Sequence, residues 1–244
     1  MQWTRQQEIL SERGQAILAN QRMALVGTGG IGSHFALLAA HVGFRNFILV
    51  DPDGNQEENR NRSAREVDLG RPKVECLREQ IQAVDSEISV ATHPCKIQEI
   101  PEVLESGTVI ASCADNWQAR SFVNREAVRR GRILVDMGFG YANEQMGCHA
   151  ALYQPGGACL LCGTLQEGAA PPSSASFLPT MMVAASLGME LLVADLTNYD
   201  RGAETRPNFL FYDAMERTLI SLRRLPRKQC PVCSDASEKT GGQG

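Results

Sequence analysis

The chain has 244 residues and a formal net charge of −4, and 43% of its residues are hydrophobic. These values fit one α/β domain, or one domain with a small appendage, and give no electrostatic reason to expect nucleic acid or a membrane surface as a partner. The opening residues, MQWTRQQEILSERG, lack the apolar core of a signal peptide. We therefore expect a cytoplasmic protein whose cysteines are reduced or bound to metal.

Short apolar runs alternate with helical periodicity up to Gly140. An amphipathic helix is expected first, over residues 6–18. Strands are then expected at 23–27, 46–51, 87–93, 107–115 and 132–138, and helices at 32–43, 73–84 and 116–131. The segment 52–73 between the second strand and the next helix is polar and irregular. The alternation predicts a Rossmann-like, doubly wound parallel sheet with helices on both faces.

The pattern changes after Gly140. Strand-like runs at 144–154, 208–214 and 218–225 surround one long apolar helix at 180–196, and predict a mixed or antiparallel second half. The helix carries Glu190 and Asp195, so we expect it in the core rather than in a membrane. The Pro- and Ser-rich segment 166–179 is expected to be a mobile loop, and the tail 234–244 to be disordered.

A glycine-rich turn joins the first expected strand to the helix after it. In ALVGTGGIGSH, the glycines are Gly27, Gly29, Gly30 and Gly32. This order favours a nucleotide-binding turn, because glycine lets the backbone approach phosphate and the helix N-terminus offers free N–H groups. The alternative is a packing turn. Asp51, at the end of the second strand, can accept hydrogen bonds from ribose hydroxyls, which suits NAD as well as ATP.

The segment after Asp51 favours ATP. It supplies Asn59, Arg62 and Lys73, with Arg60 and Arg65 between them. A triphosphate attacked at its α-phosphorus needs cations, since negative charge grows on the phosphoryl oxygens and on the leaving pyrophosphate. The alternative is a solvated, charged loop without a ligand.

Asp115 and Asn116 follow the apolar run TVIASCA, at the carboxyl end of an expected parallel strand. Open α/β sheets bind their ligands at this end. A carboxylate there suits Mg²⁺, whose remaining ligands the phosphates would supply. The alternative is that Asp115 caps the following helix, and the two roles are compatible.

The eight cysteines include two CxxC pairs in turns that contain Gly or Pro. The pairs are Cys159 with Cys162, and Cys230 with Cys233. Four thiolates suit a closed tetrahedral zinc site, which has no open position for catalysis and would tie the end of the chain to its middle. The alternative is two unrelated redox or buried pairs.

Six motifs occur in one order along the chain: TRQQEIL, GTGGIGS, DPDGNQEENRNR, GRPK, ADNWQARSFVN and FYDAMERTLISLRRLPRKQCPVC. Together they make the chain resemble the ThiF/MoeB/HesA family of ubiquitin-activating-like adenylating enzymes over residues 3–233, and the MoeB/ThiF type above all. The resemblance implies a homodimer that uses ATP, Mg²⁺ and zinc. Its substrate would be the C-terminal Gly-Gly carboxylate of a small ubiquitin-like sulfur carrier, and its products an acyl-adenylate and pyrophosphate.

The resemblance also assigns roles to individual residues. Asp51 would bind ribose, Gly30 phosphate, and Asn59, Arg62 and Lys73 the triphosphate. Asp115 would hold Mg²⁺, and Arg5 would reach into the partner subunit's site. The expected catalytic residues are therefore Arg5, Arg62, Lys73 and Asp115; the expected nucleotide-binding residues are Gly27, Gly29, Gly30, Gly32, Asp51, Asn59, Arg62, Lys73, Asp115 and Asn116.

Four parts follow from this assignment: a helix and dimer arm at 1–20, an ATP-binding half at 21–140, a carrier-binding half with the zinc knuckle at 141–233, and the tail. The carrier's own tail would pass beneath the loop 166–179. The sequence departs from the family pattern at Ser63, where glutamine is usual, and lacks any cysteine between Cys162 and Cys230. The second departure predicts adenylation without a covalent intermediate on that stretch.

Two other functions stay open. One is the same adenylating chemistry on a ribosomal peptide or on tRNA threonylcarbamoyladenosine. The other is a non-enzymatic or redox Rossmann protein, for which the cationic segment would have no purpose.

Overall fold

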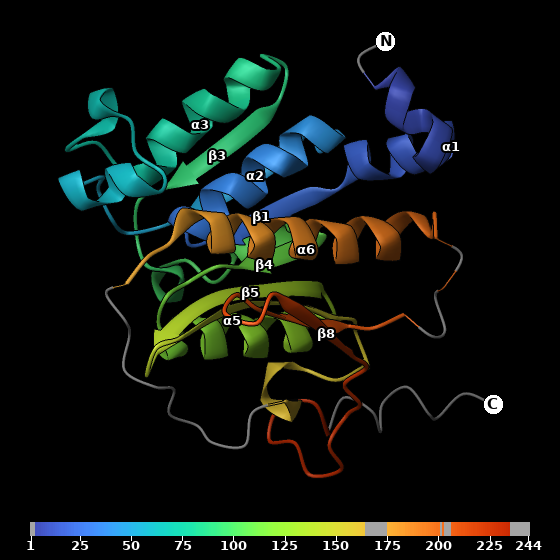
Figure 1. Ribbon diagram of the computed structural model, residues 1–244. Coiled ribbons are helices and arrows are strands. Elements are labelled where there is room, and N and C mark those ends of the chain that lie inside the picture. Colours follow the sequence, from blue (N-terminus) through green and yellow to red (C-terminus); the bar gives the residue numbers. More distant parts are fainter. Residues whose placement is uncertain (1–2, 164–174, 201, 203–205, 235–244) are drawn as a thin grey trace.

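In the computed structural model, which describes residues 3–163, 175–200, 202 and 206–234, one eight-stranded sheet has helices on both faces (Figure 1). The strands are β1 (Arg22–Val26), β2 (Asn46–Val50), β3 (Ser89–His93), β4 (Val109–Ser112), β5 (Ile133–Ala142), β6 (Gln145–Tyr153), β7 (Phe209–Asp213) and β8 (Thr218–Leu222). The α-helices are α1 (Thr4–Asn20), α2 (Gly30–Val42), α3 (Lys73–Val84), α4 (Val103–Ser106), α5 (Trp117–Arg130) and α6 (Leu178–Thr197). Four 3-10 turns are η1 (Glu57–Asn61), η2 (Glu66–Asp68), η3 (Ile97–Glu99) and η4 (Leu160–Cys162).

The first half of the sheet is parallel, with strand order β3-β2-β1-β4-β5. Val26 pairs in register with Val50 on one side and Ser112 on the other, and Ser112 pairs with Asp136. The carboxyl ends of β1, β2 and β4 therefore lie level. The central strands are almost wholly buried because helices cover both faces, which explains their continuous apolar sequences.

The second half is an antiparallel meander from β5 through β6 and β7 to β8. The β5–β6 hairpin turns at Asn143 and Glu144, both with positive φ (50° and 61°), as a two-residue hairpin turn of this twist requires. Every residue of the last strand, β8, is exposed. The expected parallel first half and antiparallel second half are both confirmed.

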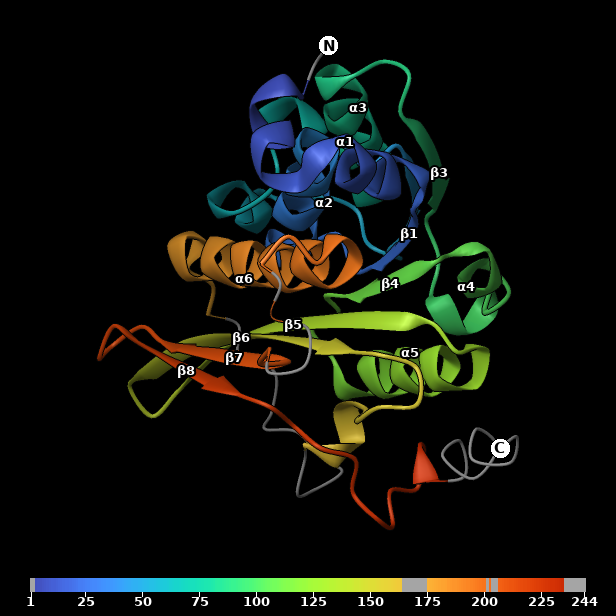
Figure 2. The same cartoon turned by 90° about the vertical axis from the view of Figure 1, so that its right-hand side faces the viewer.

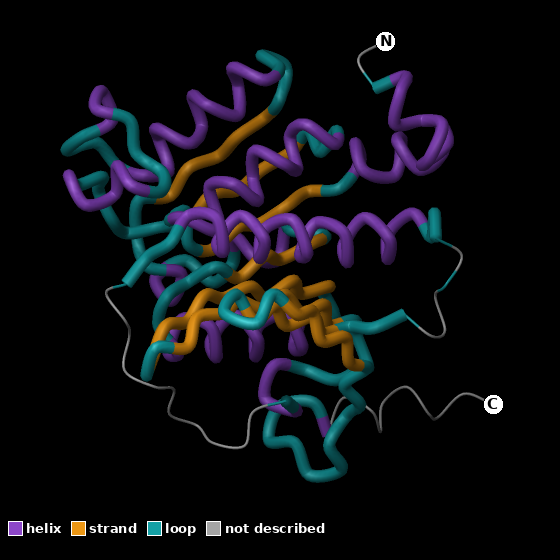
Figure 3. Tube along the Cα trace, viewed as in Figure 1, coloured by secondary structure: helices purple, strands orange, loops and turns teal. Residues whose placement is uncertain are grey.

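Helices α1, α2, α3 and α6 lie on one face of the sheet, and α4 and α5 on the other (Figure 2). Figure 3 shows the strands as one layer between these groups. Helix α6 has 20 residues, and its mean hydropathy of 1.4 over 18 residues would suffice for a membrane span. It instead packs against α2, β5 and β6 in the centre of the fold, as expected for a core helix.

Two local expectations need correction. The first helix is not continuous over 6–18, because Ser11 has φ 63° and ψ 167°. The Ser11 hydroxyl accepts a hydrogen bond from the Gly14 amide at 3.3 Å and so starts a second helical segment. The segment 52–73 is not irregular throughout, since η1 and η2 lie within it. Of the expected loop and tail, 166–174 and 235–244 lie outside the described residues.

Candidate functional site

The glycine turn between β1 and α2 is built for backbone contact. Gly27 has φ 89°, and a Cβ there would lie 2.7 Å from the Cys113 carbonyl carbon. A Cβ at Gly32 would overlap the carbonyl oxygen of Gly27. At Gly29 a Cβ would meet nothing within 4 Å, and no side chain caps the N-terminus of α2. The first turn of α2 therefore has N–H groups without a side-chain cap, which is the feature that an anion site at a helix N-terminus uses.

Asp51 joins this turn to the loop after β2. Its Oδ2 accepts hydrogen bonds from the Thr28 amide (2.6 Å) and hydroxyl (3.1 Å), and its Oδ1 accepts one from the Asp53 amide (2.9 Å). A carboxylate has about four acceptor positions, so capacity for a ribose hydroxyl remains. The sequence analysis missed the supporting roles of Thr28 and Asp53. Asp53 also accepts a hydrogen bond from Lys73 Nζ at 2.9 Å, which holds that cation beside the same loop.

Asn59 shapes the loop that presents Arg62. Its side-chain oxygen accepts a hydrogen bond from the Gln56 amide at 2.8 Å. Its carbonyl oxygen accepts hydrogen bonds from the amides of Arg62, Ser63 and Ala64 at 3.1, 2.9 and 3.1 Å. Asn59 is buried in these contacts. The structure thus places Asn59 beneath the loop, and direct contact between Asn59 and a nucleotide stays a prediction.

The cations of this loop differ in their partners. Arg60 pairs with Glu57 at 2.7 Å, and Arg65 pairs with the buried Asp68 at 2.8 Å. The hydrogen bond from Arg65 lowers the pKa of Asp68, which keeps that pair ionised. Arg62 has no carboxylate within 4.0 Å in the described part of the chain and donates only to neutral oxygens. Of Arg60, Arg62 and Arg65, Arg62 is therefore the one whose positive charge is not paired with a carboxylate of the described residues.

Asp115 follows two residues that lie against the glycine turn: the Cys113 amide donates to the Val26 carbonyl at 2.8 Å, and a Cβ at Gly27 would lie 2.8 Å from the Ala114 nitrogen. Asp115 is exposed, and the Asn116 amide group donates to it at 3.3 Å. The side chain of Asn116, and not that of Asp115, caps α5 by accepting from the Ala119 amide at 2.8 Å. The alternative in which Asp115 is the cap is therefore wrong, and its carboxylate is available for a metal ion.

Arg5 is far from these residues. It is exposed near the start of α1, where Trp3 Nε1 donates to the His41 carbonyl and Gln6 Nε2 donates to the Val42 carbonyl, both at 2.8 Å. Those carbonyls end α2, a helix of 13 residues. At 1.5 Å per residue, this end lies about 18 Å from Gly30. Within one chain the fold does not bring Arg5 to the glycine turn.

The four cysteines of the CxxC pairs form one cluster. Their sulfur atoms all lie within 4.8 Å of one another, with Cys159 and Cys230 at 3.6 Å and Cys162 and Cys233 at 3.3 Å. Asn124 of α5 supports the cluster by accepting a hydrogen bond from the Leu160 amide at 2.9 Å. The donor set and its closure fit a structural zinc ion.

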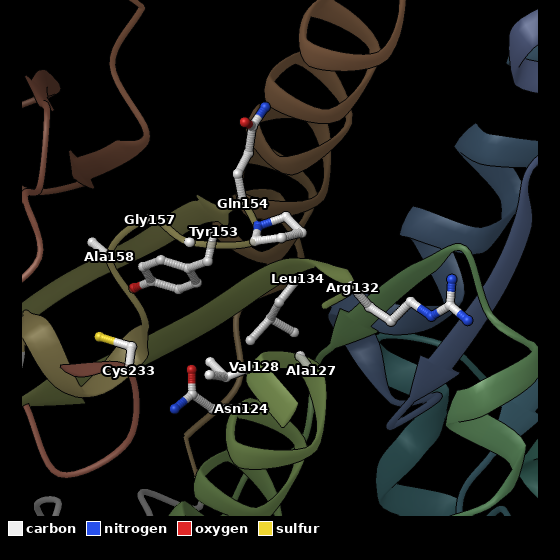
Figure 4. Close-up of a pocket in the computed structure, with 12 residues that line it drawn as sticks. Asn124, Ala127, Val128, Arg132, Leu134, Tyr153, Gln154, Gly157, Ala158 and Cys233 are labelled. Carbon is white, nitrogen blue, oxygen red and sulfur yellow. The ribbon is translucent and has the colours of Figure 1, made fainter. Parts of the chain in front are cut away.

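A small cavity lies next to this cluster, between α5, β5, β6 and the loop before Cys159. Figure 4 shows Asn124, Leu134, Tyr153 and Cys233 around it. Its volume is about 20 Å³, which is room for about one water molecule. The cavity is therefore no site for a nucleotide, and it lies apart from the carboxyl ends of β1 and β2.

A buried ionic group beneath the Asp115 loop escaped the sequence analysis. Asp136 on β5 is fully buried and accepts hydrogen bonds from Arg120 and from His149, the latter at 3.1 Å. Burial opposes ionisation of Asp136, but Arg120 and His149 together lower its pKa; burial also lowers the pKa of His149. A Cβ at Gly138 would lie 2.5 Å from His149 and 2.6 Å from Arg120. The group ties α5 to the sheet.

The ThiF family model matches residues 3–232. The "SAMP-activating enzyme E1" of Haloferax volcanii is 27% identical, over 91% of this chain and 83% of the relative. The "Sulfur carrier protein adenylyltransferase" of Thermus thermophilus is 26% identical, over 96% and 94%. The solved structure of E. coli MccB with ATP has a TM-score of 0.74 at 24% identity, over 90% of this chain and 69% of that one, and so shares the fold.

Proposed function

Because this chain belongs to the ThiF family, we propose that it is an adenylyltransferase that uses ATP to activate the C-terminal Gly-Gly carboxylate of a ubiquitin-like sulfur carrier. The two relatives named for carrier activation support this proposal, since the chain spans 83% and 94% of their lengths. The products are an acyl-adenylate and pyrophosphate. The acyl-adenylate is then the substrate for sulfur transfer.

One observation carries the proposal. The glycine turn, Asp51, Arg62, Lys73 and Asp115 converge at the carboxyl ends of β1, β2 and β4, although 88 residues separate the first of them from the last. Asp51 holds the ribose, and the N-terminus of α2 receives the phosphates. A redox dinucleotide would need no uncompensated cation such as Arg62 beside its glycine turn.

The reaction is an in-line displacement at the α-phosphorus. A carboxylate oxygen of the carrier forms the new bond to phosphorus, and the bond to the pyrophosphate oxygen breaks. Arg62 and Lys73 stabilise the charge that grows on the phosphoryl and leaving oxygens. Asp115 holds Mg²⁺, which when bound neutralises part of the same charge. Asn116 serves by fixing the start of α5, next to Asp115.

We propose that the active unit is a homodimer in which Arg5 acts on the partner subunit's triphosphate. The support is the separation of Arg5 from its own glycine turn by the length of α2. Mixing Arg5→Ala with Asp115→Ala subunits tests this. Recovered activity in the mixed dimers is expected, because one site then holds an intact Asp115 together with an intact Arg5 from its neighbour. No recovery would place Arg5 in its own site or outside catalysis.

We propose adenylation without a thioester, in the cytoplasm. Between Cys162 and Cys230 the chain has no cysteine. Cys148 lies nearby on β6, but it is buried, and burial raises the pKa of its thiol to about 12. It is therefore a poor nucleophile. None of the eight cysteines forms a disulfide, as a reducing compartment would keep them.

ATP–pyrophosphate exchange with Mg²⁺ tests the proposed reaction. Exchange should appear only with added carrier proteins that end in Gly-Gly, and should vanish when the terminal glycine is removed. ATP binding without exchange for any carrier would move the substrate to a ribosomal peptide or to tRNA threonylcarbamoyladenosine. Failure to bind ATP would overturn the proposal.

A further inference from the structure

The side chain of Ser176 connects two distant parts of the site. Ser176 lies in the short segment before α6, and its hydroxyl accepts a hydrogen bond from Asn61 Nδ2 at 2.9 Å. The same hydroxyl oxygen accepts a second bond, from Arg62 Nη1 at 3.3 Å. These two contacts join residues more than 110 positions apart, the loop after β2 and the segment that leads into α6.

Arg62 is held in this position by neutral groups alone. Its Nη1 also donates to the Glu58 carbonyl at 2.8 Å and to Asn61 Oδ1 at 2.9 Å. A phosphate oxygen adds the attraction of opposite charges, and often bidentate geometry, to its hydrogen bond with a guanidinium, and a neutral hydroxyl adds neither. A triphosphate at the N-terminus of α2 is therefore a stronger acceptor for Arg62 than the hydroxyl of Ser176.

Arg62 and the first turn of α6 also meet at Gly30, the first residue of α2. A Cβ at Gly30 would lie 2.6 Å from the sulfur of Met181, in the first turn of α6, and 3.2 Å from Cδ of Arg62. Both side chains thus lie on the first residue of α2. Met181 and Arg62 are long and have several rotatable bonds, so they can move aside without a change in the backbone.

From these contacts we infer that Ser176 is a positioning residue that holds the guanidinium of Arg62 near the start of α6 and competes with a triphosphate for it. A bound triphosphate takes the guanidinium of Arg62 from Ser176 and releases residues 175–177. The Ser176–Arg62 contact and nucleotide binding then oppose each other. A change that weakens the contact should raise the affinity for nucleotide, and bound nucleotide should weaken the contact. The inference rests on the proposed function for the identity of the nucleotide, but not for that of the acyl substrate.

Calorimetric titration with a non-hydrolysable ATP analogue and Mg²⁺, without any carrier, tests this linkage. Ser176→Ala should bind the analogue about fivefold more tightly, because one hydrogen bond of ordinary net strength no longer opposes binding. Ser176→Thr keeps a hydroxyl and should bind as the wild type does. Ser186→Ala, at an exposed position of α6, is the matched control and should have no effect.

The effect must also depend on Arg62. In an Arg62→Ala background, Ser176→Ala should leave the affinity unchanged, whereas a general effect on folding would persist there. Hydrogen exchange gives an independent readout: Ser176→Ala should raise exchange at residues 175–178 of the free protein, as the analogue should in the wild type.

Weaker or unchanged binding by Ser176→Ala would overturn the inference, as would an effect that survives in the Arg62→Ala background. Tighter, Arg62-dependent binding without carrier-dependent exchange would support the role of Ser176 and overturn the proposed substrate. The absence of any nucleotide binding by the wild type would overturn both proposals.

Discussion

The two halves of the sheet differ in the interactions that stabilise their strands. In the parallel half, β1 and β2 are buried at four of their five positions, and helices cover both faces. At the other edge, all five residues of β8 are exposed, and Leu219 and Leu222 remain 52% and 49% accessible. β8 is held by its pairing with β7 and is followed by two cysteines of the cluster.

Because of this difference, the residues expected to act on the ligand and the cysteines expected to stabilise the chain end lie in different halves of the sheet. The parallel half has a large apolar core, so its exposed polar residues can be arranged for a ligand with little effect on folding. The outer antiparallel half has less apolar burial and depends on thiolate ligands to fix its end. Changes at the nucleotide site should therefore reduce activity and leave folding intact. Changes at the cysteines should instead lower the stability of the antiparallel half.

The largest expected effect is on catalysis, from Asp115→Ala. Because Asp115 is exposed and its carboxylate has one hydrogen bond, at 3.3 Å, within the described part of the chain, its loss should leave the melting temperature unchanged. Adenylation should fall at least about 100-fold, as for removal of one preorganised charge-stabilising group. Pyrophosphate exchange and thermal melting measure the two quantities. Activity near that of the wild type would mean that Asp115 has no part in the reaction.

The second effect is on stability, from Cys230→Ser or zinc chelation. A loss of about 3 kcal/mol would lower the melting temperature by roughly 6–12 °C in a chain of this size. Hydrogen exchange should rise first in β8 and η4, and later in β1. Cys95→Ser, outside the cluster, is the matched control. Equal sensitivity of β1 and β8 would contradict the division of the sheet.

The third effect is a pH dependence from the buried ionic group. Burial lowers the pKa of His149 in the folded protein, so below about pH 6.5 the unfolded chain binds the proton more readily and stability falls. The lowered pKa of Asp136 keeps its own contribution until the pH falls below about 4. His149→Gln should flatten the stability curve below about pH 6.5 in urea titrations. An unchanged slope in that variant would assign the dependence to other groups.

The smallest effect is expected on β8 itself. Leu219→Ala should change the free energy of unfolding by no more than about 0.5 kcal/mol, because the side chain is half exposed. Leu25→Ala, at a fully buried position of β1, should cost about 2–5 kcal/mol. Urea denaturation of both variants checks the difference. Similar costs at the two positions would show that β8 is buried in the assembled protein.

Features with short spacing were predictable from the sequence. The glycine turn, both CxxC pairs and the change from parallel to antiparallel strands each depend on residues a few positions apart. The group of Arg120, Asp136 and His149 was not predictable, because its members lie on three elements and their sequences indicate only a helix and two ordinary strands. The cap of α5 was misassigned by one residue, since Asp115 and Asn116 are equally good caps and backbone geometry decides between them.

The cysteine cluster also has a consequence for the order of folding. Its two halves lie 71 residues apart, and the strands β7 and β8 lie between them. Each CxxC pair can bind a metal ion weakly as soon as it forms, but the closed four-sulfur site requires the antiparallel meander to be in register. Uptake of metal into the tight site should therefore be a late kinetic step. The rate of this uptake, followed by a thiolate-to-metal absorbance band, would report how fast the last strands of the sheet form.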